Sequence, residues 1–437
     1  MAKRVKLYII VPVLLLSCVA MLYSAPKSGA SSDASSPGYR FAPVIFIHGF
    51  LGSGDTWASQ VQRFTSNGVP AGKLFAYDWN SMGRGGDGNA MLKSFVDSVL
   101  TLTGGTGVHL VGHSAGGGRA YSYLSSPERA ATVISYVHIG SGAQRAPAGP
   151  DGSVPTLNIY SDADMVVRGG DIPGAQNVIL EGADHYEVAT SADAFAEMYR
   201  FFYGEPPSVT TITGSDRIRI GGRAVTLGTN QPATGVTVDL YVAGSDGNSD
   251  GEPVASFTIP ESGNWGPVEV EPETNYMFHI RSERQGFRNL YYYFEPFVRN
   301  NPLVYLRTFP PPVSMAGMLL AGLPSDDETG VIAIFSSSQA VIHGRDNLFL
   351  NDFELSTPEL AGENATSISF FCFDDGRDGQ GDAEPVALFA AMPFLQGANI
   401  PVFTGQEQTW YANFNGRTIP VRNFRSRTEG VVIAVFW

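Results

Sequence analysis

Apolar residues follow two different patterns along the chain, and the pattern changes near residue 205. Before that point, short continuously apolar runs alternate with segments whose apolar residues recur every three to four positions. Continuously apolar runs are typical of parallel strands that are covered on both faces. Segments whose apolar residues recur every three to four positions are typical of amphipathic helices. We expect strands at residues 43–48, 74–79, 108–113, 133–139, 156–160 and 177–180, and helices at 55–66, 90–102 and 192–202 and directly after residue 114. Asp55 stands where it can cap the first helix.

Strands that alternate with helices predict an α/β fold, with a parallel sheet of about six strands and right-handed crossovers. Beyond residue 205 the apolar period becomes two, in short runs such as 236–242 and 254–259. Loops rich in Gly, Asp and Asn separate these runs, a pattern that predicts an all-β region. Residues 309–312 (Phe-Pro-Pro-Pro) divide this region, so one composite barrel and two sandwiches both remain open.

Composition gives the expected domain boundaries. Residues 1–25 are basic and then apolar, as in a signal or anchor segment, and residues 26–40 form a spacer rich in Ser, Ala and Gly. A catalytic domain is expected at 41–204 and an all-β region at 208–437, either undivided or split into portions 208–308 and 313–437. The first segment predicts a secreted protein or, alternatively, one anchored to a membrane through that segment.

The charge balance and the cysteines narrow the function. The chain has 42 acidic and 28 basic residues, a formal net charge of −14, which argues against nucleic acid as a partner. Its two cysteines are Cys18 and Cys372. Removal of the leader would leave only the second, so no intrachain disulfide is expected.

The chemistry centres on the segment Gly112-His113-Ser114-Ala115-Gly116, which ends an apolar run and precedes a helical pattern. Gly-x-Ser-x-Gly in that context is typical of a nucleophile elbow, a sharp strand-to-helix turn that exposes the serine. A side chain at either glycine would crowd this turn. The sequence therefore predicts Ser114 as a nucleophile.

A serine nucleophile needs a base and a carboxylate that orients the base. His185 follows a predicted strand and a loop, where the base belongs in such a fold. Asp162 and Asp164 both follow the strand at 156–160, and residue pattern alone leaves the choice between them open.

Further roles follow from position. The backbone N–H groups of Phe50 and Ala115 are expected to form the oxyanion hole. Apolar side chains on the predicted rim loops suit an acyl chain or a lipid surface, and the tentative substrate-binding residues are Leu51, Trp79, Met165, Val166 and Tyr186. No metal or organic cofactor is implied. The acidic, glycine-rich loops 244–252 and 374–382 are compatible with calcium binding and equally with solvated hairpin tips.

Four segments carry a family resemblance: residues 45–49, 112–116, 159–167 and 182–185. They resemble the minimal, lidless bacterial lipases of the lipase A type. In that family a Tyr-Ser-Ser-Ala-Asp-Met-Ile-Val run holds the catalytic acid, and the resemblance therefore implies Asp164 as the acid. Asp162 stands where the family has serine.

Segments at 67–70, 126–131, 201–204 and 296–299 extend the resemblance to two-domain thermostable lipases of archaeal type, in which a C-terminal β-barrel follows the α/β-hydrolase unit. Those lipases carry a long helical lid after the second strand, whereas residues 79–89 form a short loop here. We therefore expect no such lid and little interfacial activation.

Together these features predict a secreted carboxylic-ester hydrolase, a lipase or esterase, whose partner is an ester or lipid substrate and which acts at a lipid or polymer surface. The alternative enzyme is an aliphatic polyester depolymerase that uses the β region to hold the polymer. A non-catalytic binding protein on the same fold is a third hypothesis, which the intact Ser, Asp and His disfavour.

Overall fold

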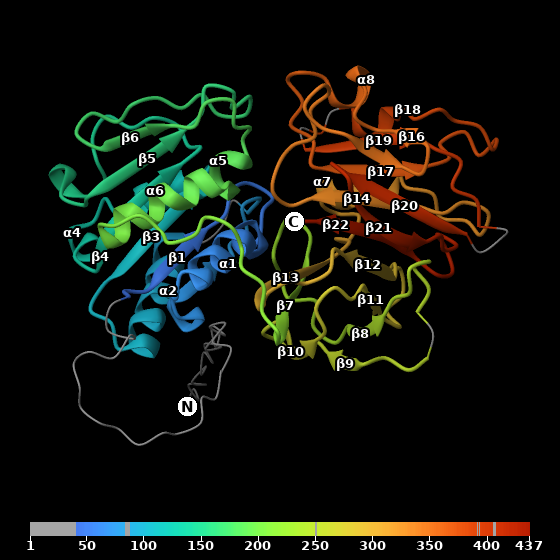
Figure 1. Ribbon diagram of the computed structural model, residues 1–437, viewed down its shortest axis with the longest axis horizontal. Helices are drawn as coiled ribbons and strands as arrows, with labels where there is room; N and C mark the ends of the chain where they lie inside the picture. Colours follow the sequence, from blue (N-terminus) through green and yellow to red (C-terminus); the bar gives the residue numbers. More distant parts are fainter. Residues whose placement is uncertain (1–40, 84–87, 250, 391, 393, 405–407) are drawn as a thin grey trace, which may run out of the picture.

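The computed structural model describes residues 41–83, 88–249, 251–390, 392, 394–404 and 408–437. The predicted export segment and spacer, and part of the 79–89 loop, lie outside these residues. Within them, none of the helices combines the length and apolar character needed to cross a bilayer. Figure 1 shows an α/β part at the left, from blue to green, beside a β part from yellow-green to red.

The α/β part is built on a parallel sheet that has six strands in the described residues, in the order β2-β1-β3-β4-β5-β6. The fold class predicted from the alternating pattern is thereby confirmed. The strands are β1 (Val44–Ile47), β2 (Leu74–Tyr77), β3 (Val108–His113), β4 (Val133–Ile139), β5 (Thr156–Tyr160) and β6 (Gln176–Ile179). The central strands β1 and β3 are buried throughout, because helices cover both faces of the sheet.

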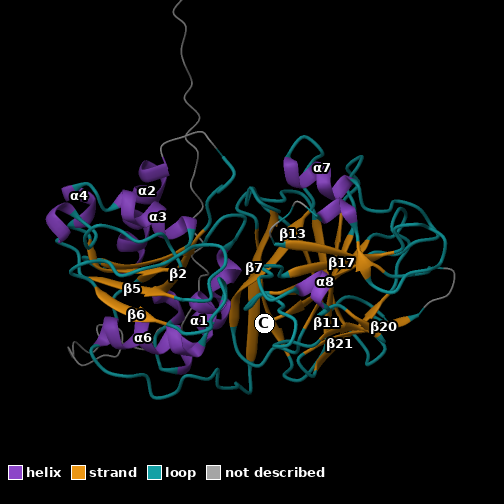
Figure 2. Cartoon of the chain, turned by 90° about the horizontal axis from the view of Figure 1, so that it is seen from above, coloured by secondary structure: helices purple, strands orange, loops and turns teal. Residues whose placement is uncertain are grey.

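Helices flank this sheet on its two faces (Figure 2). On one face lie α1 (Ala58–Ser66) and α6 (Ala192–Tyr203), and on the other α2 (Gly88–Thr103) and α3 (Ala115–Tyr123). Successive residues of a strand point to opposite faces of the sheet, so each face has its own apolar core. Phe46 packs with α1 and α6, and Ile45 packs with α2 and α3. The shorter elements are η2 (Gly54–Trp57), η3 (Ala71–Lys73), α4 (Pro127–Ala130), η4 (Pro150–Gly152) and α5 (Glu187–Thr190).

The prediction that Asp55 caps the first helix is wrong. That helix begins at Ala58, after the 3₁₀ turn η2, and no side chain caps the turn. The Asp55 carboxylate is buried and lies 2.6 Å from the Arg307 guanidinium of the β part. A buried carboxylate is stable only with a charge or hydrogen-bond partner, and here a distant arginine supplies it.

The β part holds three sheets in the described residues: β10-β7-β13, β16-β15-β20-β21 and the nine-stranded β18-β19-β17-β14-β22-β12-β11-β8-β9. Strand β22 pairs in parallel with both β12 and β14. The portions 208–308 and 313–437 therefore share one sheet. The strands are β7 (Ile218–Thr226), β8 (Thr237–Val242), β9 (Ala255–Thr258), β10 (Asn264–Val270), β11 (Tyr276–Arg281), β12 (Leu290–Phe294), β13 (Asn301–Thr308), β14 (Ile332–Ser336), β15 (Leu348–Leu350), β16 (Phe353–Glu354), β17 (Ser369–Phe373), β18 (Glu384–Pro385), β19 (Leu395–Asn399), β20 (Thr409–Phe414), β21 (Arg417–Arg422) and β22 (Val431–Phe436).

The middle strands of the large sheet are buried on both faces. Along β12, Tyr292 enters the core shared with the three-stranded sheet, whereas Tyr291 and Tyr293 enter the core shared with the four-stranded sheet. Along β12 the period of two thus separates two cores, whereas in the edge strand β9 it separates Ala255 and Phe257, which pack on a core, from the exposed Ser256 and Thr258. Short helical elements also belong to this part: α7 (Met315–Ala321), α8 (Pro358–Ala361) and η5 (Ala387–Phe389).

The two parts share a continuous apolar core. Leu303 and Tyr305 of β13 and Val225 of β7 are buried among residues of α1, α6 and the parallel sheet. Strand β13 therefore sets the position of the β part against the loop that follows β1. This docking brings the β part to the carboxyl ends of β1 and β2, the edge where ligands bind in open α/β sheets.

Candidate active site

Ser114 sits at a strained turn between β3 and α3. Its backbone has φ 53° and ψ −125°, outside the regions that L-residues ordinarily occupy. The turn passes so close to its surroundings that a Cβ on Gly116 would lie 2.4 Å from the carbonyl oxygen of His48. A Cβ on Gly112 would lie 2.7 Å from that of Gly116. Neither position has room for a side chain, and both therefore require glycine.

The structure brings His185 and Asp164 together. His185 Nδ1 lies 2.7 Å from Asp164 Oδ2, and both residues are buried. The other carboxylate oxygen accepts the N–H groups of Val166 at 2.8 Å and Val167 at 2.9 Å. Burial acts to raise the pKa of Asp164, but the hydrogen bonds and the His185 charge outweigh it and lower the net pKa. An ionised Asp164 assigns the proton to Nδ1 and leaves Nε2 free as a base.

Asp162 has a different neighbour. Its side chain is exposed, and Oδ1 accepts the N–H of Gly182 at 2.9 Å. It therefore supports the loop that leads to His185 and does not reach the imidazole. The sequence pattern leaves the choice between Asp162 and Asp164 open, but in the fold only Asp164 contacts His185.

His113 links the elbow to the histidine loop. Its Nε2–H donates to the backbone oxygen of His185 at 2.8 Å, and the two ring centroids are 4.6 Å apart. Burial lowers the pKa of His113 to about 3, so the ring is neutral and keeps this donor role. Among the described residues no hydrogen bond joins the Ser114 hydroxyl to His185. Such contacts commonly tighten only when substrate binds.

Phe50 follows β1, and Ala115 begins α3 directly after Ser114. Within the described residues, the backbone N–H groups of these two residues have no hydrogen-bond acceptor. They are the pair expected to form an oxyanion hole. The Phe50 side chain is 42% exposed at the rim.

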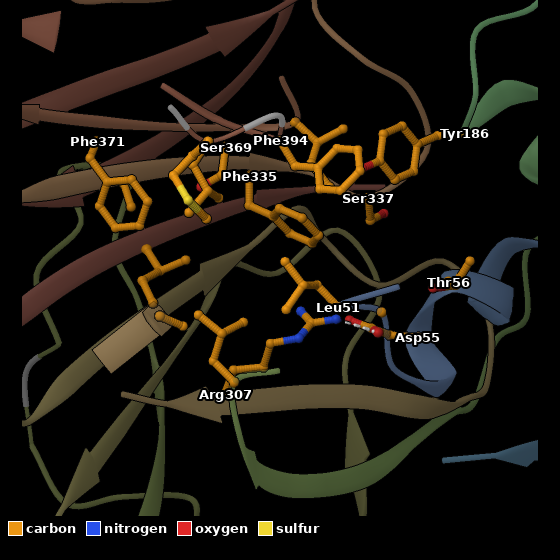
Figure 3. Close-up of a pocket in the computed structure, with 18 of the residues that line it drawn as sticks. Leu51, Asp55, Thr56, Tyr186, Arg307, Phe335, Ser337, Ser369, Phe371 and Phe394 are labelled. Carbon is orange, nitrogen blue, oxygen red and sulfur yellow. Dashed lines mark hydrogen bonds and ion pairs between the residues drawn. The ribbon is translucent and has the colours of Figure 1, made fainter. Parts of the chain in front are cut away.

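A cavity of about 140 Å³ opens beside this loop, between the two parts (Figure 3). The α/β part contributes Phe50, Leu51, Gly52, Asp55, Thr56 and Tyr186. The β part contributes a mainly apolar wall that consists of Leu227, Tyr292, Arg307, Phe309, Ala316, Ala333, Phe335, Ser337, Ile368, Ser369, Phe371, Met392, Phe394, Leu395 and Ile433. The Arg307–Asp55 ion pair balances the charge in this wall (Figure 3).

The tentative substrate-binding residues do not all line this cavity. Leu51 and Tyr186 do, whereas Met165 is 55% and Val166 37% exposed at another part of the rim. Trp79 lies against the loop that follows β1, where its indole N–H donates to the carbonyl oxygen of His48 at 2.9 Å. Trp79 is half-buried, and its contact with substrate stays a prediction.

Residues of the β part that pattern analysis did not single out hold the site loops. Asn230 binds the loop after β1, Arg307 pairs with Asp55, and Arg345 pairs with Asp184 next to His185. One signal could have pointed to Arg307: it ends an otherwise apolar strand run, 303–306, where a basic residue needs a buried partner. Asn230 and Arg345 lie in turns and carry no comparable signal.

No group of three His, Cys, Asp or Glu side chains with a metal-binding arrangement occurs in the part of the chain that the structure describes. In the loop at 374–382, Asp374 Oδ2 accepts the N–H of Gly379 at 2.8 Å. In the loop at 244–252, Asp246 accepts the N–H of Asn248 at 3.0 Å.

Comparison with known proteins gives two family matches. Residues 42–138 match the family described as alpha/beta hydrolase fold, and residues 216–311 match the lipase C-terminal domain. The first match and the six-stranded sheet show an α/β-hydrolase fold in the first part of the chain. A curated relative is the dihydrolipoyllysine-residue acetyltransferase component of the acetoin cleaving system of Cupriavidus necator, 28% identical over 139 residues. The alignment covers 28% of this chain and only 37% of that protein.

Solved structures with similarity include bromoperoxidase from Bacillus anthracis (20% identity, 38% of this chain, 92% of that chain, TM-score 0.30). The Bacillus licheniformis lipase BlEst2 in its mature form is 16% identical, over 37% of this chain and 93% of that one, with TM-score 0.31. Aspergillus fumigatus lipase B is 15% identical, over 41% and 57%, with TM-score 0.30.

Proposed function

We propose that the protein hydrolyses carboxylic esters of fatty acids through Ser114, His185 and Asp164. The observation that carries the proposal is the buried 2.7 Å hydrogen bond between His185 and Asp164 at the loop that His113 ties to the serine elbow. It supplies a base of fixed tautomer close to the elbow that holds the half-buried Ser114 in a strained conformation, and nucleophilic catalysis by a hydroxyl requires such a base.

In this mechanism Ser114 Oγ attacks the ester carbonyl while His185 Nε2 takes its proton. The carbonyl π electrons move to oxygen, and the N–H groups of Phe50 and Ala115 stabilise the resulting oxyanion. The intermediate collapses, His185 returns the proton to the leaving alcohol, and an acyl-enzyme remains. Water, activated by the same imidazole, attacks the acyl-enzyme and releases the acid and the free serine. Asp164 stays ionised and stabilises the imidazolium that forms twice in the cycle.

The cavity between the parts supports a fatty-acyl substrate. Its walls at Phe50, Leu51 and Tyr186 belong to the loops that carry the proposed oxyanion amide and base. The three triad residues do not line it, and we propose that it takes the acyl chain while the ester carbonyl stays outside it, at Ser114. Aromatic and aliphatic side chains of the β part form most of the remaining surface. Burial of apolar chain there gains about 0.8 kcal/mol for each methylene.

The deciding experiment is a series of p-nitrophenyl esters from acetate to palmitate, beside emulsified triglyceride and an aliphatic polyester film. We expect turnover on the soluble esters, with kcat/KM rising as the chain lengthens until the cavity is filled. The matched control is Ser114→Ala, which should lower kcat by at least about 10⁴-fold because the triad acts as a unit. A folded parent without activity on any ester would overturn the proposal, and activity on the film alone would favour the polyester alternative.

A further inference from the structure

The oxyanion loop after β1 rests on a side chain of the β part. Asn230, 6% exposed, lies in the turn that follows β7, with φ 56°. Its Nδ2 lies 3.2 Å from His48 Nε2, 2.9 Å from the Gly52 carbonyl oxygen and 3.2 Å from that of Trp79. Its Oδ1 accepts the Ser53 hydroxyl at 2.7 Å. One amide therefore joins four groups that surround the loop.

The turn that carries Asn230 is packed closely against the same loop. A Cβ on Gly228 would lie 2.8 Å from Met82 Sδ and 3.2 Å from Leu51 Cδ2. The backbone of Asn230 also has the left-handed conformation that asparagine tolerates better than most residues. Both features place the Asn230 amide beneath the loop with little freedom.

The Asn230 amide is one of three groups that fix the tautomer of His48. His48 Nδ1 lies 2.8 Å from the carbonyl oxygen of Gly49, and a carbonyl only accepts, so Nδ1 carries the proton. Nε2 then accepts, from the N–H of Trp79 at 3.2 Å and from Asn230. Burial lowers the pKa of His48, which keeps the ring neutral in the range where esterases work.

The tautomer of His48 in turn sets the direction of the Phe50 N–H, one of the two proposed oxyanion donors. The carbonyl of Gly49 and the N–H of Phe50 belong to one planar trans peptide group, in which they point in opposite directions. When His48 holds that oxygen, the Phe50 N–H faces away from His48. Without the His48 hydrogen bond only the longer one from the N–H of Gly52, at 3.3 Å, restrains the peptide, and its rotation would bring a carbonyl oxygen, with the wrong charge, toward the developing oxyanion.

We infer that Asn230 is a positioning residue for the oxyanion hole, acting through His48 and the Gly49–Phe50 peptide, and that the β part is thereby required for transition-state stabilisation. The inference rests on the proposed ester hydrolysis for its kinetic consequence. Its structural content, the tautomer of His48, stands independently of that reaction.

The test uses Asn230→Asp in the full chain, a near-isosteric change that tolerates the same backbone. An acceptor facing Nε2 draws the proton to that nitrogen and removes the shorter of the two hydrogen bonds to the Gly49 oxygen, which leaves the N–H of Gly52 at 3.3 Å as its donor. We expect kcat to fall about 10²-fold or more, the usual effect of losing one oxyanion donor, while KM changes less than about threefold. Affinity for an alkylboronic acid, which forms a tetrahedral adduct with the serine, should fall in parallel with kcat.

Two further variants keep the outcome decisive. Asn230→Gly suits the left-handed backbone and removes the side chain, and should lower kcat about tenfold because water can replace part of the amide. Arg299→Gln is the control: Arg299 of the β part contacts Thr65 of α1 at 2.9 Å, away from the site, and its loss should leave kcat unchanged.

Nitrogen-15 NMR of the His48 imidazole gives the readout that does not need activity. The parent should show a protonated Nδ1 and an unprotonated Nε2, and Asn230→Asp should reverse this. An unchanged tautomer, or kcat within about threefold of the parent in both Asn230 variants, would overturn the inference. An inactive parent with the expected tautomer would instead overturn the ester-hydrolase proposal, and with it the kinetic part of the inference, while the assigned tautomer of His48 would stand.

Discussion

Arg345 of the β part lies 2.9 Å from the Asp184 carboxylate, immediately before His185 in the chain. The same guanidinium lies 2.6 Å from Glu187. The Asp184 side chain also accepts the N–H groups of Tyr186 at 2.7 Å and, in the β part, of Ala340 at 2.9 Å. The loop that carries the proposed base is therefore held from the β part as well as from its own sheet.

Replacing Arg345 by methionine should loosen that loop. We expect the free energy of unfolding to fall by about 1–2 kcal/mol, since Asp184 keeps its amide donors but loses its charged partner. The kcat should fall severalfold because His185 is no longer held firmly. Urea unfolding and ester kinetics measure the two effects. Arg200→Met is the control, since its ion pair with Glu197 is exposed and contributes roughly 0.5 kcal/mol or less. Equal effects of the two substitutions would contradict the inference that Arg345 holds the loop that carries His185.

Substitutions of Asp164 and Asp162 should have different effects on kcat. Asp164→Asn should lower kcat by about 10⁴-fold, because an amide at that position favours the wrong imidazole tautomer. Asp162→Asn removes only a charge that accepts the N–H of Gly182, and kcat should stay within about tenfold of the parent. Circular dichroism checks that both variants fold. The opposite ranking would transfer the orienting role to Asp162.

The sequence predicted what depends on local pattern. The elbow at Ser114, the sheet and the position of His185 follow from short-range periodicity and from the order of strands and loops. The contacts that complete the site do not, because they join residues 182 positions apart for His48 and Asn230, and 252 for Asp55 and Arg307. Asp55 illustrates the limit: its position suits a helix cap, but a buried guanidinium from the other part is a stronger partner.

A second limit concerns supporting side chains. Trp79 was expected among the substrate-binding residues because a large apolar side chain on a predicted rim loop suits a lipid. In the fold its indole N–H binds the His48 carbonyl, and Arg119 stacks over the ring at 4.5 Å. Residue type and loop position do not predict these contacts, and the contact of Trp79 with substrate stays a prediction.

Buried histidines predict how stability depends on pH. Burial lowers the pKa of His109 to about 4, and its ring stacks on Phe202 with centroids 4.3 Å apart. In the unfolded chain the pKa is about 6.5, so between these values the unfolded state binds more protons and stability falls as pH falls. At pH 5 this group alone costs about 2 kcal/mol relative to neutral pH.

The variant His109→Gln isolates that contribution. Urea unfolding of the parent and the variant, at neutral pH and near pH 5, gives the loss of stability on acidification for each. We expect the loss to be about 2 kcal/mol smaller in the variant, whatever its stability at neutral pH. Identical losses would show that His109 titrates alike in the folded and unfolded chains.

The cavity between the two parts predicts the acyl-chain preference. Ser369 of β17 lines it, and Figure 3 shows Phe371 toward the end opposite Thr56. Ser369→Phe should fill space that the distal carbons of a long chain would occupy. Exclusion of about three methylenes, at about 0.8 kcal/mol each, should lower kcat/KM for a laurate ester about fiftyfold. The butyrate ester, whose chain ends nearer the oxyanion loop, should lose less than about threefold. Ser369→Ala serves as the matched control, because it creates no obstruction and should keep the parent's profile. A uniform loss across all chain lengths in Ser369→Phe would mean that the acyl chain binds elsewhere.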